Sequence, residues 1–68
     1  MSGSQELSSK QIEVLQLAAD GLTYADMAEQ LNRPKRTVVG RAVRAMQVLG
    51  ADNIVQAVAM AVRRGLIK

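Results

Sequence analysis

Five cationic side chains lie close together in the middle of the chain, within the segment NRPKRTVVGRAVR at residues 32–44. They are Arg33, Lys35, Arg36, Arg41 and Arg44. No acidic residue occurs between Gln30 and Ala51. Guanidinium and ammonium groups donate hydrogen bonds to phosphate oxygens, and arginine matches planar acceptors in pairs. A helix face that is merely solvated more often mixes cations with glutamates, so this segment indicates a surface for a polyanion.

Residues that could do covalent or metal chemistry are scarce in this sequence. The 68-residue chain contains no histidine and no cysteine, which removes the commonest general base, the thiol nucleophile and the best zinc ligands. Its six acidic residues do not cluster at ligand spacing, and there is no glycine-rich phosphate loop. The sequence therefore predicts that the protein is not an enzyme, with no catalytic residue, no metal site and no cofactor.

The composition predicts the kind of element that positions the cations. Hydrophobic residues make up 49% of the chain but aromatic residues only 1%, and alanine, leucine and valine dominate. Such side chains suit helices that pack closely, so the expected fold class is all-α. Nine Lys and Arg against six Asp and Glu give a net charge of only +3, so the position of the charges is more informative than their sum.

Apolar spacing and helix-end signals predict four helices, at residues 9–20, 24–31 and 34–49, and from 53 or 54 to about 64. The residues expected at their N-terminal ends are Ser8, Thr23, Pro34, and either Asp52 or Asn53. Asn32 and Gly50 tolerate the left-handed conformation and are expected to end the second and third helices.

The chain is expected to form one domain. Residues 1–6 are small and polar and are expected to be a disordered leader, and residues 7–68 make up the domain. The opening MSGSQ lacks the apolar run of a signal peptide, and no apolar window approaches the roughly 18 residues of a membrane span. A cytoplasmic protein without a membrane partner is therefore the default expectation.

The spacing within residues 24–44 is typical of a helix-turn-helix motif. Ala28 is small enough to let two helices approach, Asn32 lies at the turn, and Val38 is the apolar anchor of the second helix. A plain pair of antiparallel helices in a small bundle is the alternative interpretation of the same spacing.

A helical projection of residues 34–49 separates two faces. One narrow arc, the expected core face, holds Val38, Ala42, Ala45 and Leu49. The opposite side holds Arg36, Gly40, Val43, Arg44 and Gln47, with Thr37 and Arg41 on one flank. The cations lie toward the N-terminus of the helix, which suits entry of its first turns into the major groove of double-stranded DNA.

Motifs along almost the whole chain match those of a known family. The segment LSSKQIEVLQLAADGLTYADMAEQL is similar to the pattern LTxREXEVLxLxAxGxSxxEIAxxL, and TV at 37–38, LG at 49–50, Asn53 and QAVAMAVRRGLI continue the match. The chain thus resembles, over residues 7–67, the DNA-binding domain of LuxR/GerE-type transcription regulators, including NarL-type response regulators. The resemblance implies a four-helix domain whose third helix enters the major groove and whose fourth helix forms a homodimer contact.

This chain departs from the family pattern at several positions. Pro34, Val39 and Arg41 stand where the family usually has serine, lysine and histidine, and Val48 and Ile54 replace a usual lysine and arginine. The family's base-reading side chains commonly come from the positions held here by Val39, Gly40 and Val43.

The candidate DNA-binding residues are Lys35, Arg36, Thr37, Val39, Gly40, Arg41, Val43, Arg44 and Gln47. We expect Arg36, Arg44 and Gln47 to contact base edges, because they can form hydrogen bonds there. Lys35, Thr37 and Arg41 are assigned to phosphates, which carry no sequence information directly. Val39 and Val43 can touch only apolar features, chiefly the thymine methyl group, so a short and degenerate half-site is expected.

The apolar side chains of the fourth helix cover an arc wider than a helix needs to pack on one small core. Harmlessly exposed alanine is one explanation. The preferred one is self-association, with a dimer interface formed by Val55, Val58, Ala59 and Val62.

These observations predict a stand-alone transcription regulator that binds double-stranded DNA as a homodimer. The alternative is a protein-interaction module, in which Val39 and Val43 on the outward face of the third helix dock a related regulator and inhibit it.

Overall fold

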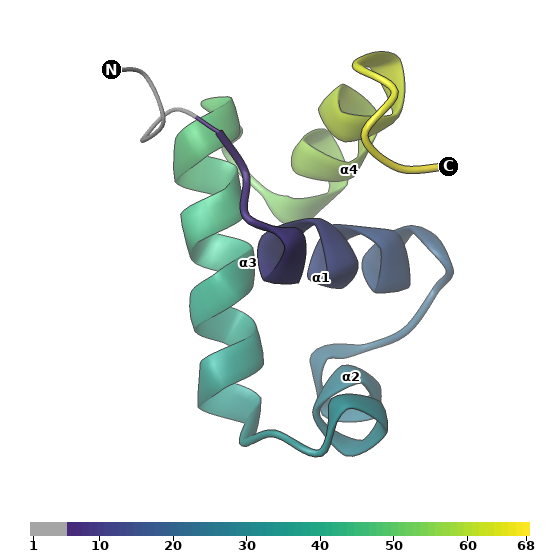
Figure 1. The fold of residues 1–68 in the computed structure, drawn as a ribbon, viewed down its shortest axis with the longest axis vertical. Coiled ribbons are helices and arrows are strands. Elements are labelled where there is room, and N and C mark those ends of the chain that lie inside the picture. The colour runs from purple at the N-terminus through teal and green to yellow at the C-terminus, as the bar shows by residue number, and fades with distance from the viewer. Residues whose placement is uncertain (1–5) are drawn as a thin grey trace.

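The computed structural model describes residues 6–68 as four helices joined by short turns (Figure 1). The helices are α1 (Ser9–Ala19), α2 (Tyr24–Leu31), α3 (Lys35–Leu49) and α4 (Ile54–Arg63). Residues 6–68 contain no strand, so the all-α expectation is confirmed. The leader expected at residues 1–6 lies, apart from Glu6, outside the described residues.

Side-chain caps begin three of the four helices. At α1 the Ser8 hydroxyl accepts a hydrogen bond from the Gln11 N–H at 3.2 Å, and the Gln11 side chain accepts one from the Ser8 N–H at 3.0 Å. Thr23 and Asp26 form the same reciprocal pair at α2, with both distances 3.1 Å. Asn53, rather than Asp52, caps α4. These caps satisfy backbone donors that a helix leaves unpaired at its first turn.

Three helix ends differ by one residue from the sequence-based expectation. Asp20 and Arg64 are the C-caps of α1 and α4 rather than their last residues. Pro34 is the N-cap of α3, not part of its first turn, because its ψ of 145° is extended.

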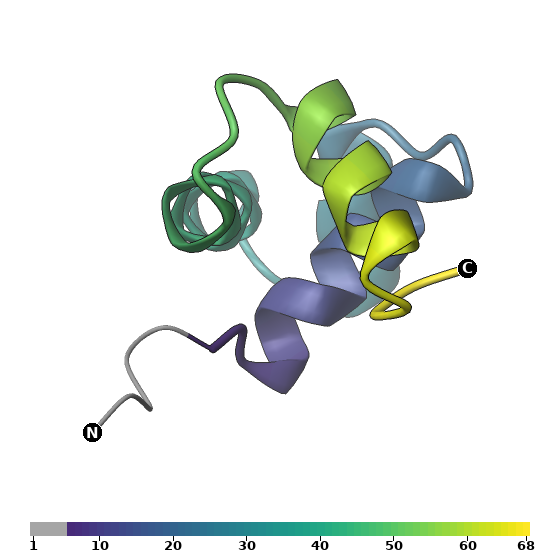
Figure 2. The same ribbon diagram turned by 90° about the horizontal axis from the view of Figure 1, so that it is seen from above.

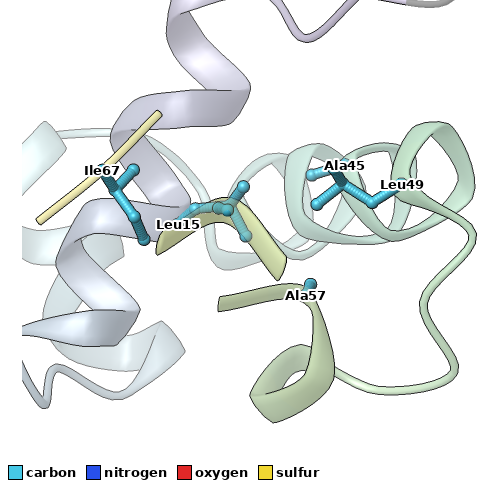
Figure 3. Packing of buried hydrophobic residues seen from close by; sticks show 6 residues of the cluster. Leu15, Ala45, Leu49, Ala57 and Ile67 are labelled. Atoms are coloured by element: carbon cyan, nitrogen blue, oxygen red, sulfur yellow. The ribbon is translucent and has the colours of Figure 1, made fainter. Parts of the chain in front are cut away.

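α1 lies between two groups of buried side chains, and its adjacent residues Val14 and Leu15 each contribute to a different group. The lower cluster joins α1, α2 and the first half of α3 through Val14, Met27, Val38 and Ala42. The upper cluster joins α1, the second half of α3, α4 and the C-terminal residues through Leu15, Ala45, Leu49, Ala57, Ala61 and Ile67. Figure 3 shows Leu15 between Ile67 and the α3 residues Ala45 and Leu49.

The C-terminal tail is part of the core. Ile67 is only 6% exposed, and the N–H of Lys68 donates a hydrogen bond to Gln16 Oε1 of α1 at 2.9 Å. The sequence alone indicated only a short tail after Gly65, because a single isoleucine beyond a helix end has no periodicity to reveal its burial.

α3 stands along one side of the molecule. Figure 2 views it nearly along its axis, and α1, α2 and α4 all lie on the same side of it. One long face of α3 is consequently free of intramolecular contacts with other helices. Within residues 6–68 no single helix is long and apolar enough to cross a membrane. α3 and α4 reach that length and apolar character only together, and they are bent by 58° relative to each other.

Candidate nucleic-acid interface

α2, a three-residue turn and α3 form the helix-turn-helix unit. Asn32 adopts the left-handed conformation with φ 54° and ψ 49°, as expected for the residue that ends α2. The N–H of Arg33 then donates to the Ala28 carbonyl at 3.0 Å, which closes the end of α2. Because Pro34 follows at once with an extended ψ, the chain can start α3 in a new direction.

The buried face of α3 fixes which side chains point outward. Val38, Ala42 and Ala45 are fully buried and Leu49 is nearly so, which confirms the predicted core face. The exposed residues on the opposite side include the cations Arg36 and Arg44 together with Gly40 and Gln47. Lys35 is also exposed, in the first turn of α3. Thr37 and Arg41 are half-buried on the flank where the projection places them.

The two valines of the expected outward face differ in exposure. Val43 is 42% exposed and lies among the outward cations. Val39 was also expected on the outward face but is half-buried, because it lies about 100° round the helix from Val38, between the outward face and the buried face. Val43 is therefore the apolar side chain that this face of α3 offers to a ligand.

The first turn of α3 carries an unfavourable charge arrangement. Pro34 provides no side-chain hydrogen bond to the helix, in contrast to Ser8, Thr23 and Asn53 at the other helices. The first turn contains Lys35 and Arg36 and no acidic residue. Cations near a helix N-terminus oppose the helix dipole, whereas an anion there is stabilised by it. A phosphate group beside this turn would relieve that repulsion and accept the free backbone donors.

The predicted dimer residues of α4 divide into two pairs. Val55 is 76% and Val62 47% exposed, so both belong to an uncovered surface. Val58 and Ala59 are half-buried, and Val58 packs against the upper cluster. Leu66, which sequence reasoning missed, is 39% exposed. Its position beyond the end of α4 placed it outside the helical projection.

Shallow apolar hollows lie beside this part of α4. One, of about 240 Å³, is lined by Ala18, Ala19, Ile54, Val55 and Val58. The other, of about 290 Å³, is lined by Ala18, Leu22, Thr23, Tyr24, Met27 and Ile54. They share Ala18 and Ile54, so together they form an apolar groove between the end of α1 and the start of α4.

Within residues 6–68, no three His, Cys, Asp or Glu side chains gather where they could hold a metal ion. The same part of the chain has no buried polar or charged side chain. The polar side chains of these residues therefore all reach the surface.

A family model described as "Bacterial regulatory proteins, luxR family" matches residues 5–61 of this chain. The chain belongs to the luxR family. The match spans α1, α2, α3 and most of α4, so it includes both the helix-turn-helix unit and the helix that packs behind it. The luxR-family domain is a DNA-binding domain of transcription regulators and not an enzyme.

Curated proteins of this kind include the "Transcriptional regulatory protein RcsB" of Escherichia coli (strain K12), Shigella flexneri and Salmonella typhi. Each is 39% identical to this chain over 51 residues, which is 75% of the chain but 24% of the relative. The chain thus spans about a quarter of the length of the curated relatives that it matches.

Proposed function

We propose that this chain regulates transcription by binding double-stranded DNA as a homodimer, with α3 of each copy in the major groove. The observation that carries the proposal is the outward face of α3, which is cationic, free of acids and opposite a fully buried face. Membership of the luxR family supports the same function. Binding to the chromosome would place the protein in the cytoplasm.

The position of each polar side chain on α3 suggests its role. Arg36, Arg44 and Gln47 point away from the core and can reach base edges in the groove. Thr37 and Arg41 lie on a flank, toward the wall of the groove, where the phosphates are. Lys35 lies in the first turn, where an anion is favoured. These assignments leave two arginines and one glutamine per copy to select bases.

We expect Arg44→Ala and Arg36→Ala each to flatten the base preference at one position of the half-site. An arginine paired with guanine discriminates against a wrong base by about 1–3 kcal/mol. The measurement is selection of binding sites from random duplexes by the wild type and by each variant. Arg63→Ala is the control, because it removes an exposed arginine from α4.

Wild-type selection should give a short, degenerate half-site containing guanine, and Arg63→Ala should give the same site. A long and sharply defined site, or unchanged preferences in both α3 variants, would contradict this assignment of reading residues. The four helices enclose a core of their own. We therefore expect these 68 residues to bind without a further domain.

The uncovered surface of α4 supports the homodimer. Val55 and Val62 lie about two turns apart, and Val55 also borders the apolar groove at the end of α1. A contact with two-fold symmetry uses the same surface of both copies. The Val55 side chain of each copy would therefore be buried against the α4 surface of the other. Such a dimer would present two α3 helices to successive major grooves about 34 Å apart.

Val55→Asp is expected to shift a dimer to a monomer while the helical circular dichroism signal survives. The reason is that a buried charge without a partner is costly in an interface, whereas Val55 is already exposed within one copy. Sedimentation equilibrium measures the shift. Gln56→Glu is the matched control, because it places a negative charge on an exposed neighbour in the same helix.

Val58 is less suitable for this test, because its contact with the upper cluster confounds folding with association. A wild-type monomer at high micromolar concentration would contradict the homodimer, as would an unchanged dimer in Val55→Asp.

A second candidate function rests on Val43, whose exposure places an apolar side chain in the middle of the α3 face. In that case α3 binds and inhibits a related regulator instead of DNA. Failure of the wild type to enrich any duplex, together with loss of regulator binding in Val43→Lys, would favour this function.

A further inference from the structure

Gly40 has no structural explanation within the chain. It lies near the middle of the fifteen-residue helix α3 and is exposed. The glycines with positive φ are Gly21, Gly50 and Gly65, so Gly40 does not serve an unusual backbone conformation. A methyl group added to its Cα would meet nothing within 4 Å outside the local backbone of the helix. Because glycine is the poorest helix former after proline, alanine would suit this position better.

The surroundings of Gly40 make it a depression in the outward face of α3. Arg36 and Arg44 lie one helical turn before and after it, and Val43 lies on the same side. The two arginines are long, whereas Val43 is short and glycine has no side chain. A ligand can therefore approach the α3 backbone more closely at Gly40 than at its neighbours on this face.

The chemistry of this depression limits what it can accept. The backbone N–H and C=O groups in a helix interior are already paired with each other, so Gly40 offers no hydrogen bond to a base edge. Val43 lines one side of the depression with methyl groups and is 42% exposed. In the major groove the apolar group that projects from a base is the C5-methyl of thymine.

We infer that Gly40 is the point of closest approach between α3 and DNA, and that Gly40 and Val43 together seat a thymine methyl group. This inference rests on the proposed function and adds a specificity-determining position to it. It predicts a thymine beside the guanine that Arg36 or Arg44 reads. It also explains why a residue that weakens the helix occupies the centre of its binding face.

The decisive variant is Gly40→Ala, which should change stability and binding in opposite directions. Its melting temperature should rise by about 4–8 °C, because a better helix former replaces glycine in open space. Its affinity for a duplex selected by the wild type should fall about tenfold, because an added methyl group blocks close approach. Ser9→Ala is the control, since it changes an exposed residue of α1, outside the α3 face, and should leave DNA affinity unchanged.

A second measurement tests the thymine contact. Each thymine of the selected half-site is replaced in turn by deoxyuridine, which lacks only the methyl group. One replacement should weaken binding of the wild type and have a smaller effect on Gly40→Ala.

If Gly40→Ala binds the selected duplex as tightly as the wild type, the inference is overturned while the proposed function stands. It is also overturned if no deoxyuridine replacement affects the wild type. If the wild type binds no duplex even at low salt, the proposed function and this inference fail together.

Discussion

Ile67→Ala is expected to destabilise the domain by about 2–5 kcal/mol, the range measured when a buried isoleucine or leucine is truncated to alanine. Ile67 is 6% exposed and belongs to the upper cluster with Leu15 and Ala61. A domain of this size has only a small margin of stability, so the loss should leave a large fraction of the chain unfolded at ambient temperature. Urea and thermal denaturation, followed by circular dichroism, measure the effect.

The matched control for Ile67 is its neighbour Lys68. The Lys68 side chain is exposed and only its backbone N–H bonds to Gln16, so Lys68→Ala should change the stability by no more than about 0.5 kcal/mol. Equal stabilities of the two variants would show that the tail does not dock on α1 in solution.

The affinity of the proposed homodimer for duplex DNA is expected to fall steeply with salt. Lys35 and Arg41 are assigned to phosphates, which gives four neutralised phosphates per dimer. Each contributes about 0.9 logarithmic units per tenfold change in salt, so binding should weaken by roughly three to four orders of magnitude over that range. Fluorescence anisotropy with a labelled duplex at several salt concentrations gives the slope.

Arg41→Ala should weaken binding to all sequences alike and should make the salt slope shallower, because a phosphate contact carries no base information. Arg64→Ala is the matched control, since it removes the same charge from the C-cap of α4. Salt-independent binding, or equal slopes for Arg41→Ala and Arg64→Ala, would argue against the assigned phosphate contacts.

The helices and their ends were largely predictable from the sequence because the signals that set them are local. Capping boxes at Ser8 and Thr23 begin α1 and α2, and the left-handed residues Asn32 and Gly50 end α2 and α3. The spacing of Val38, Ala42, Ala45 and Leu49 identified the buried face of α3. The family motifs span nearly the whole chain, and the match to the luxR family confirms the predicted resemblance. The DNA-reading and dimer residues remain predictions.

Tertiary structure decided which apolar side chains are buried among those that do not follow the helical spacing of a core face. Ile67 is buried because the tail folds back onto α1 and α4. Val58 contacts the core while Val55 in the same helix stays exposed. Val39 is more covered than Val43. Helix formation depends on residues within one or two turns of each other, whereas burial depends on segments distant in sequence that meet only after folding. The sequence by itself therefore determined the helices and the cationic face. Only the packing of the helices and the tail determined which large apolar side chains are buried, such as Ile67, and which remain exposed to a partner, such as Val55 and Leu66.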